Sequence, residues 1–172
     1  MRSRLALAWA LSFIVSPFAV ASTDVSVQVS LYWEGRELRE PNIEAVAKLR
    51  EAFPDIPVTH FINPVYVLDE GKVAETLQYL QKVTGKDDEV GLYLAPVEPL
   101  VRRAGVLLKL QPSFWGYIDE GEMCEDDCGL DVPLTVYNRE EVLRIFSSAH
   151  SALQKAGFTD LRSFAVRGWH QR

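Results

Sequence analysis

Two candidate catalytic side chains, Glu34 and Arg167, stand just beyond the ends of two predicted strands. Glu34 follows the alternating segment 25–31, and Arg167 follows the strand predicted at 161–166. In parallel α/β proteins the loops at the carboxyl ends of the strands converge on one rim, where the chemistry occurs. A carboxylate there can act as a base or a metal ligand, and an arginine can polarise a carbonyl group. The alternative is that Glu34 lies in a solvated loop beside a packed aromatic residue.

Four large aromatic residues form a candidate substrate-binding set. They lie at the ends of predicted strands or in the irregular middle of the chain: Trp33, Tyr93, Trp115 and Trp169. Aromatic rings can stack on the apolar faces of sugar rings, which would make a binding rim. Core packing is the alternative, because large aromatic residues dominate the cores of proteins.

The two cysteines, Cys124 and Cys128, are expected to form a disulfide that closes a small acidic loop. A lone pair of cysteines in an exported chain is most often bridged, whereas a zinc site needs more than two ligands. The histidines His60, His150 and His170 share no metal-ligand spacing, so these residues predict no metal site. We expect His60 to be a satisfied histidine of the core or rim, and His150 to lie on a helix surface.

The elements that would position these residues follow from periodicity and from the Gly and Pro residues that interrupt it. Strands are predicted at 25–31, 58–62, 89–94 and 161–166, with a further possible strand at 106–110. Helices are predicted at 41–53, 73–83, 98–104 and 140–156, the last begun by a capping box of Asn138 and Glu141. The alternating order predicts an α/β fold with parallel strands and right-handed crossovers. Four or five strands are too few to close an eight-stranded barrel.

The first 21 residues are expected to be a signal peptide rather than part of the fold. Arg2 and Arg4 precede an apolar run over 5–15, and Ala19 to Ala21 resembles a cleavage site. No other segment is apolar enough for a membrane span. The chain holds 24 acidic and 18 basic residues, a formal charge of −6. This acidity argues against nucleic acid as a partner. We therefore expect an exported protein, periplasmic or secreted.

Several stretches resemble the polysaccharide deacetylase (NodB-homology) superfamily, in particular an exported bacterial branch. The similar stretches, in chain order, are 29–35, 57–64, 88–92, 111–116, 124–133 and 163–169. The resemblance implies a partial (β/α) barrel of the glycoside hydrolase/deacetylase type, with 22–172 as its N-terminal portion. It also implies a hydrolase acting on acetylated cell-wall or exopolysaccharide glycans, with a divalent metal such as zinc as the usual cofactor.

The chain departs from that family at the residues that usually hold the metal. Trp33 and Glu34 occupy the place of an Asp pair, and Tyr93 and Ala95 replace two histidines. Tyrosine is a poor ligand at neutral pH because its phenol stays protonated, and alanine offers no ligand atom. These departures predict no metal ligands and little or no hydrolase activity.

Three functions therefore remain open from the sequence. The first is a degenerate or weakly active deacetylase whose aromatic rim still binds polysaccharide or oligosaccharide. The second is a working enzyme that uses Glu34 and Arg167, with Glu98 or His60 recruited. The third is a non-catalytic carbohydrate-binding or protein-interaction domain, with a partner chain covering the C-terminal strand.

Overall fold

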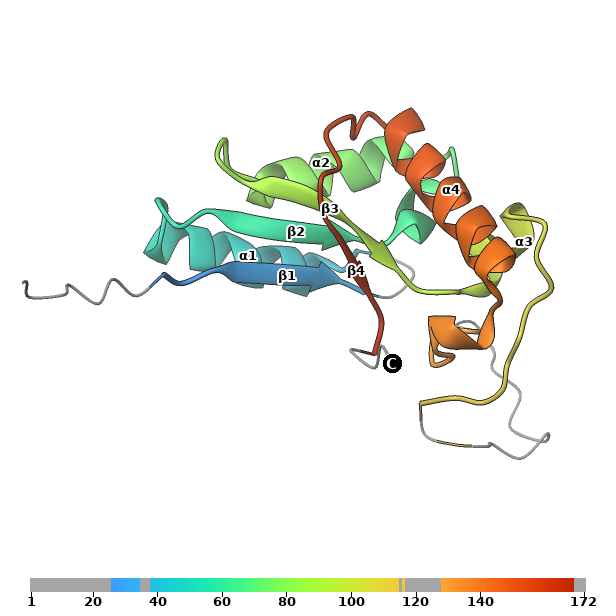
Figure 1. Cartoon of the computed structure of the whole chain (residues 1–172). Coiled ribbons are helices and arrows are strands. Elements are labelled where there is room, and N and C mark those ends of the chain that lie inside the picture. The colour runs from blue at the N-terminus through green and yellow to red at the C-terminus, as the bar shows by residue number, and fades with distance from the viewer. Residues whose placement is uncertain (1–25, 35–37, 115, 117–127, 169–172) are drawn as a thin grey trace, which may run out of the picture.

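A computed structural model describes residues 26–34, 38–114, 116 and 128–168. The predicted signal peptide lies outside these residues. Four parallel strands form one sheet in the order β1-β2-β3-β4: β1 Val29–Trp33, β2 Val58–Ile62, β3 Glu89–Leu94 and β4 Phe164–Val166. The sheet curls into a half-barrel, seen in Figure 1. The α/β class and the parallel order of the partial barrel are thus confirmed.

The connecting helices cover the outer side of this sheet and supply much of the core. They are α1 Glu40–Ala52, α2 Val73–Val83, α3 Glu98–Arg103 and α4 Arg139–Lys155, with short 3-10 turns η1 Pro64–Val67 and η2 Leu134–Val136. Helix α4 begins at the predicted capping box, in which Asn138 accepts from the backbone N–H of Glu141 and Glu141 from that of Asn138. Its buried residues Ile145, Ala149 and Leu153 recur at helical spacing and face the core.

The strand register sorts the side chains onto two faces. Successive residues along a strand point to opposite faces, whereas residues paired across adjacent strands point to the same face. Leu31 pairs with His60, and Trp33 with Ile62, on the outer face that the helices cover. Tyr32, Phe61 and Gly91 pair across three strands on the inner face. There the rings of Tyr32 and Phe61 stack with centroids 5.2 Å apart. Aromatic side chains therefore fill the hollow of the half-barrel.

Most predicted boundaries agree with the structure to within a residue or two, and three predictions do not. The strand predicted at 161–166 begins only at Phe164, where its pairing with β3 starts opposite Leu92. The first strand begins at Val29 rather than Val25, because its pairing with β2 starts at Val29 opposite Val58. Residues 26–28 are exposed. The possible strand at 106–110 is wrong: this segment pairs with no strand, and the Lys109 N–H instead donates to the hydroxyl of Tyr137 (3.1 Å). Within the described residues, no helix is both long and apolar enough to span a membrane.

Candidate functional site

The carboxyl ends of β1 and β4 bring together the two predicted catalytic residues, Glu34 and Arg167. The Arg167 guanidinium donates from Nη1 to Glu34 Oε2 (2.7 Å) and from Nη2 to Asp131 Oδ1 (2.7 Å). Glu34 and Arg167 are 133 residues apart in the sequence and follow the two outer strands of the sheet, so the curl of the half-barrel makes them neighbours. We call Glu34, Tyr93, Asp131 and Arg167 the rim cluster.

Tyr93 forms the floor of the rim cluster. Its side chain is only 1% exposed, and its hydroxyl makes no hydrogen bond of ordinary geometry. Burial raises its pKa, and the nearby Glu34 carboxylate raises it further, against the opposing effect of Arg167. The phenol therefore stays protonated and remains a hydrogen-bond donor at physiological pH.

Arg167 is the cation at the centre of the cluster. Burial opposes its charge, but the hydrogen bond to Asp131, the nearby Tyr93 hydroxyl and the charge of Glu34 outweigh this effect and raise its pKa. Its side chain is 22% exposed, against 46% for Glu34 and 40% for Asp131. The two carboxylates thus present an open, acidic face to solvent, while the cation that orients them lies deeper.

Two contacts of the cluster were not predicted from the sequence. Asp131 lies in an irregular segment after the cysteine loop, where no periodicity marks it. The hydroxyl of Tyr66, on η1, donates to the backbone carbonyl of Glu34 and fixes the end of β1. Burial and then the charge of Glu34 raise the pKa of Tyr66. Asp131 lies within the stretch 124–133 that resembles the deacetylase superfamily, but no local sequence pattern indicated a role for it.

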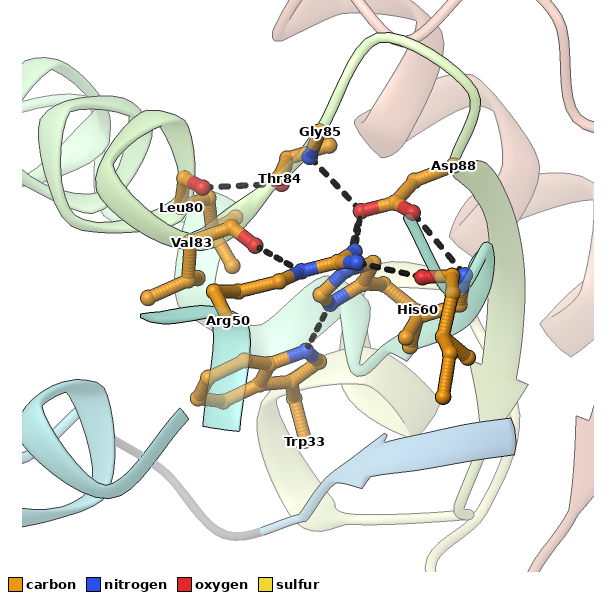
Figure 2. A network of polar contacts seen from close by, with 10 residues as sticks. Trp33, Arg50, His60, Leu80, Val83, Thr84, Gly85 and Asp88 are labelled. Atoms are coloured by element: carbon orange, nitrogen blue, oxygen red, sulfur yellow. Dashed lines mark hydrogen bonds and ion pairs between the residues drawn. The ribbon is translucent and has the colours of Figure 1, made fainter. Parts of the chain in front are cut away.

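Trp33 does not belong to the rim cluster. Strand alternation turns it to the outer face, where it is 6% exposed and its indole Nε1–H donates to His60 Nδ1 (3.1 Å), as Figure 2 shows. Tyr93 is equally inaccessible, so neither ring offers a free face for stacking on a sugar. Trp115 and Trp169 lie outside the described residues, as does Cys124, so their binding role and the disulfide to Cys128 stay predictions.

His60, in the middle of β2, belongs to a buried polar network on the outer face that extends to the amino-terminal ends of β2 and β3. Its Nε2 lies 3.1 Å from Asp88 Oδ2, and Asp88 also accepts from Arg50 and from the backbone N–H groups of Val58 (2.9 Å) and Gly85 (2.6 Å) (Figure 2). Because Nδ1 accepts from Trp33, the ring is neutral with its proton on Nε2. Burial, followed by the charge of Arg50, lowers its pKa to about 4.

This network joins α1, β2, α2 and the start of β3 rather than forming a reactive site. Arg50 also donates to the carbonyls of Val83 (3.2 Å) and Ile56 (2.6 Å). The amino-terminal ends of parallel strands usually contribute stability, whereas reactions occur at the carboxyl ends. His60 is thus the satisfied core histidine expected from the sequence, with 0% exposure.

The described residues do not fit the metal site that the deacetylase resemblance implies. No group of three His, Cys, Asp or Glu side chains in this part of the chain could hold an ion. At the two positions where the family has histidines, Tyr93 keeps its proton and Ala95 is fully buried without a ligand atom. The carboxylates of Glu34 and Asp131 are instead held by Arg167.

Comparison with known proteins adds no relative: no family model, curated protein or solved structure matches the chain. The geometry of the rim cluster is therefore the observation on which a function must rest.

Proposed function

We propose that this chain is an exported glycan-binding domain on a partial barrel of the polysaccharide deacetylase type, with weak hydrolase activity at most. One observation supports the proposal above the others. The rim cluster gathers two carboxylates, a guanidinium and a buried phenol from four separate segments at the carboxyl ends of the strands.

The donors and acceptors of this cluster suit a sugar. Exposed carboxylate oxygens of Glu34 and Asp131 accept hydrogen bonds from sugar hydroxyls, and the half-exposed face of such a site stays wet, as carbohydrate sites commonly are. The Tyr93 hydroxyl is an unused donor that could reach the carbonyl of an acetamido group once the ligand displaces Arg167 or Glu34 slightly. The acidic composition of the chain favours a neutral or amino sugar over an anionic one.

Binding is favoured over hydrolysis because the possible catalytic groups are engaged with each other. Both Nη groups of Arg167 donate to carboxylates, so the guanidinium is not free to polarise a carbonyl. Glu34 accepts from Arg167 in the same ion pair and has no neighbouring metal site within the described residues. A deacetylase of the usual kind needs a metal-bound water to attack the acetyl carbonyl.

Isothermal calorimetry with chitin oligomers and their fully deacetylated counterparts tests the proposal. We expect saturable binding at millimolar ligand or below. Binding should weaken about tenfold in Arg167→Gln, because the two carboxylates that accept from the sugar lose the guanidinium that orients them. Arg162→Gln is the matched control. Arg162 lies just before β4 and pairs with Asp160 on the surface, outside the rim cluster. Absence of heat with every oligomer would refute the binding role.

Acetate release measured in the same samples, with and without zinc, separates the enzyme alternative. Zinc-dependent release that Glu34→Gln abolishes would replace the binding proposal with a catalytic one. We expect no release above that of the Glu34→Gln variant.

A further inference from the structure

We propose that the groove between helices α3 and α4 binds a phosphate-bearing anion. The groove has a volume of about 510 Å³ and is lined by three cations and three hydroxyls: Arg103, Arg144, Lys155, Ser147, Ser148 and Ser151. Figure 1 shows α3 and α4 side by side at the edge of the molecule. The groove shares no residue with the rim cluster, so this proposal does not depend on the proposed function.

The charge of the groove runs against the composition of the chain. The chain as a whole has a formal charge of −6, yet the groove lining contains no carboxylate. Arg102, next to the groove, is paired with Glu98 (2.5 Å), and Glu141 of α4 is paired with Lys109 (2.8 Å). Among the described residues, none of the three groove cations forms such a pair. A bound anion would supply the missing countercharge.

Helical spacing places the groove donors on one stripe of α4. Arg144, Ser148, Ser151 and Lys155 are separated by four, three and four residues, which puts them on the same face of the helix. Arg103 joins this stripe from the last turn of α3. Donors from two elements therefore converge on one space, which a random scatter of surface lysines would not produce.

The donor types favour phosphate over a carboxylate. Arg144 is already oriented, because its Nη1 donates to the carbonyl of Gly105 (3.1 Å), which leaves its other N–H groups available. A guanidinium fork matches two oxygens of a phosphate, and the serine hydroxyls can donate to the third. The phosphate could come from a soluble phosphate compound or from a lipid headgroup, and the experiment distinguishes these two sources.

Amide chemical shifts of the ¹⁵N-labelled chain, titrated with inorganic pyrophosphate at constant ionic strength, test the site. We expect saturable shifts at Arg103 and at the three serines, with affinity about tenfold lower in the triple variant Arg103→Gln, Arg144→Gln, Lys155→Gln. The matched control removes the same charge from exposed lysines elsewhere, as Lys48→Gln, Lys72→Gln, Lys86→Gln, and should bind as the parent does. All six positions are exposed, so both variants should melt at the parent temperature.

Sedimentation with vesicles of phosphatidylglycerol or of phosphatidylcholine forms the second arm. Groove-dependent binding of pyrophosphate supports a soluble phosphate ligand. Binding to phosphatidylglycerol vesicles alone, lost in the triple variant but not in the control, supports the same chemistry from a lipid headgroup. Unsaturable shifts spread over the chain, or equal affinity in the triple variant and the control, would overturn the proposal.

Discussion

At the scale of single residues, the alternation of β1 places two adjacent side chains in different environments, the rim cluster and the buried network of His60. Glu34 reaches inward to Arg167 at the rim, whereas Trp33 turns outward and donates to the buried His60. A sequence that places a carboxylate beside a tryptophan suggests one shared site. The pleat of the strand instead separates them, because successive residues point to opposite faces.

The neutral state of His60 predicts an acid-sensitive stability. Its pKa falls from 6.5 to about 4 on folding, so the unfolded chain binds a proton that the folded chain does not. The stabilisation is complete above pH 6.5 and is lost as pH falls toward 4. The loss attributable to His60 between pH 7 and pH 5 should be about 2 kcal/mol. Urea unfolding across this range measures it.

The variant His60→Gln keeps a side-chain acceptor and donor but cannot titrate. We expect it to be less stable than the parent at pH 7 and to show a flatter pH dependence. His150→Gln, on α4, is the control and should keep the slope of the parent. An unchanged slope in His60→Gln would assign the acid sensitivity to other groups.

At the scale of elements, the sequence was most informative where one segment determines its own structure. The pattern of β2 and β3 matched their observed bounds, and the capping box located the start of α4 to within a residue. The start of β1 was missed because it depends on where the partner strand β2 begins. The local pattern of residues 25–31 contains no information about that partner. Three of the four residues of the rim cluster were singled out from the sequence, and the fourth was missed for the same reason. Glu34 and Arg167 directly follow predicted strands, but Asp131 lies in a loop that only the fold brings near them.

The middle of β3 shows how tightly these elements fit. A Cβ atom added at Gly91 would lie 2.5 Å from the Ser163 hydroxyl and 2.8 Å from the Phe61 ring. Because Phe61 stacks on Tyr32 and fills the hollow of the sheet, it has little room to move. Gly91→Ala should therefore cost about 1 to 3 kcal/mol of stability.

Urea unfolding of Gly91→Ala beside Gly85→Ala checks this value. At Gly85 the nearest atom to an added Cβ is Asp88 Oδ2 at 3.4 Å, an ordinary contact, so we expect a change close to zero there. Equal stability of the two variants would mean that the inner aromatic cluster is loosely packed.

At the scale of the whole molecule, the half-barrel has two outer strands, β1 and β4, that pair on one side only within the described residues. On either side of β4, Ser163 and Arg167 direct backbone groups toward β3, since the Ser163 carbonyl accepts from the Leu92 N–H and the Arg167 N–H donates to the Leu94 carbonyl. Alternation then turns the backbone groups of Phe164 and Val166 toward the open edge. Such an edge can pair with another strand, and the proposed partner chain over the C-terminal strand would bind there.

A charge placed on that edge tests whether a second copy of the chain is such a partner. Phe164 is 59% exposed although it is large and apolar, so Phe164→Lys removes an exposed ring and adds the kind of side chain that discourages edge pairing. We expect the parent chain to associate with rising concentration in sedimentation velocity, and Phe164→Lys to remain monomeric over the same range. Phe53→Lys makes the same exchange at a residue of similar exposure (52%) that follows α1 and belongs to neither outer strand, and it should associate as the parent does. Because Phe164 also contacts Phe146 of α4 (centroids 5.9 Å apart), the melting temperature of each variant must be measured alongside.

A parent chain that is monomeric at every concentration would leave the edge to a different partner, and equal association of both variants would place the interface elsewhere on the molecule.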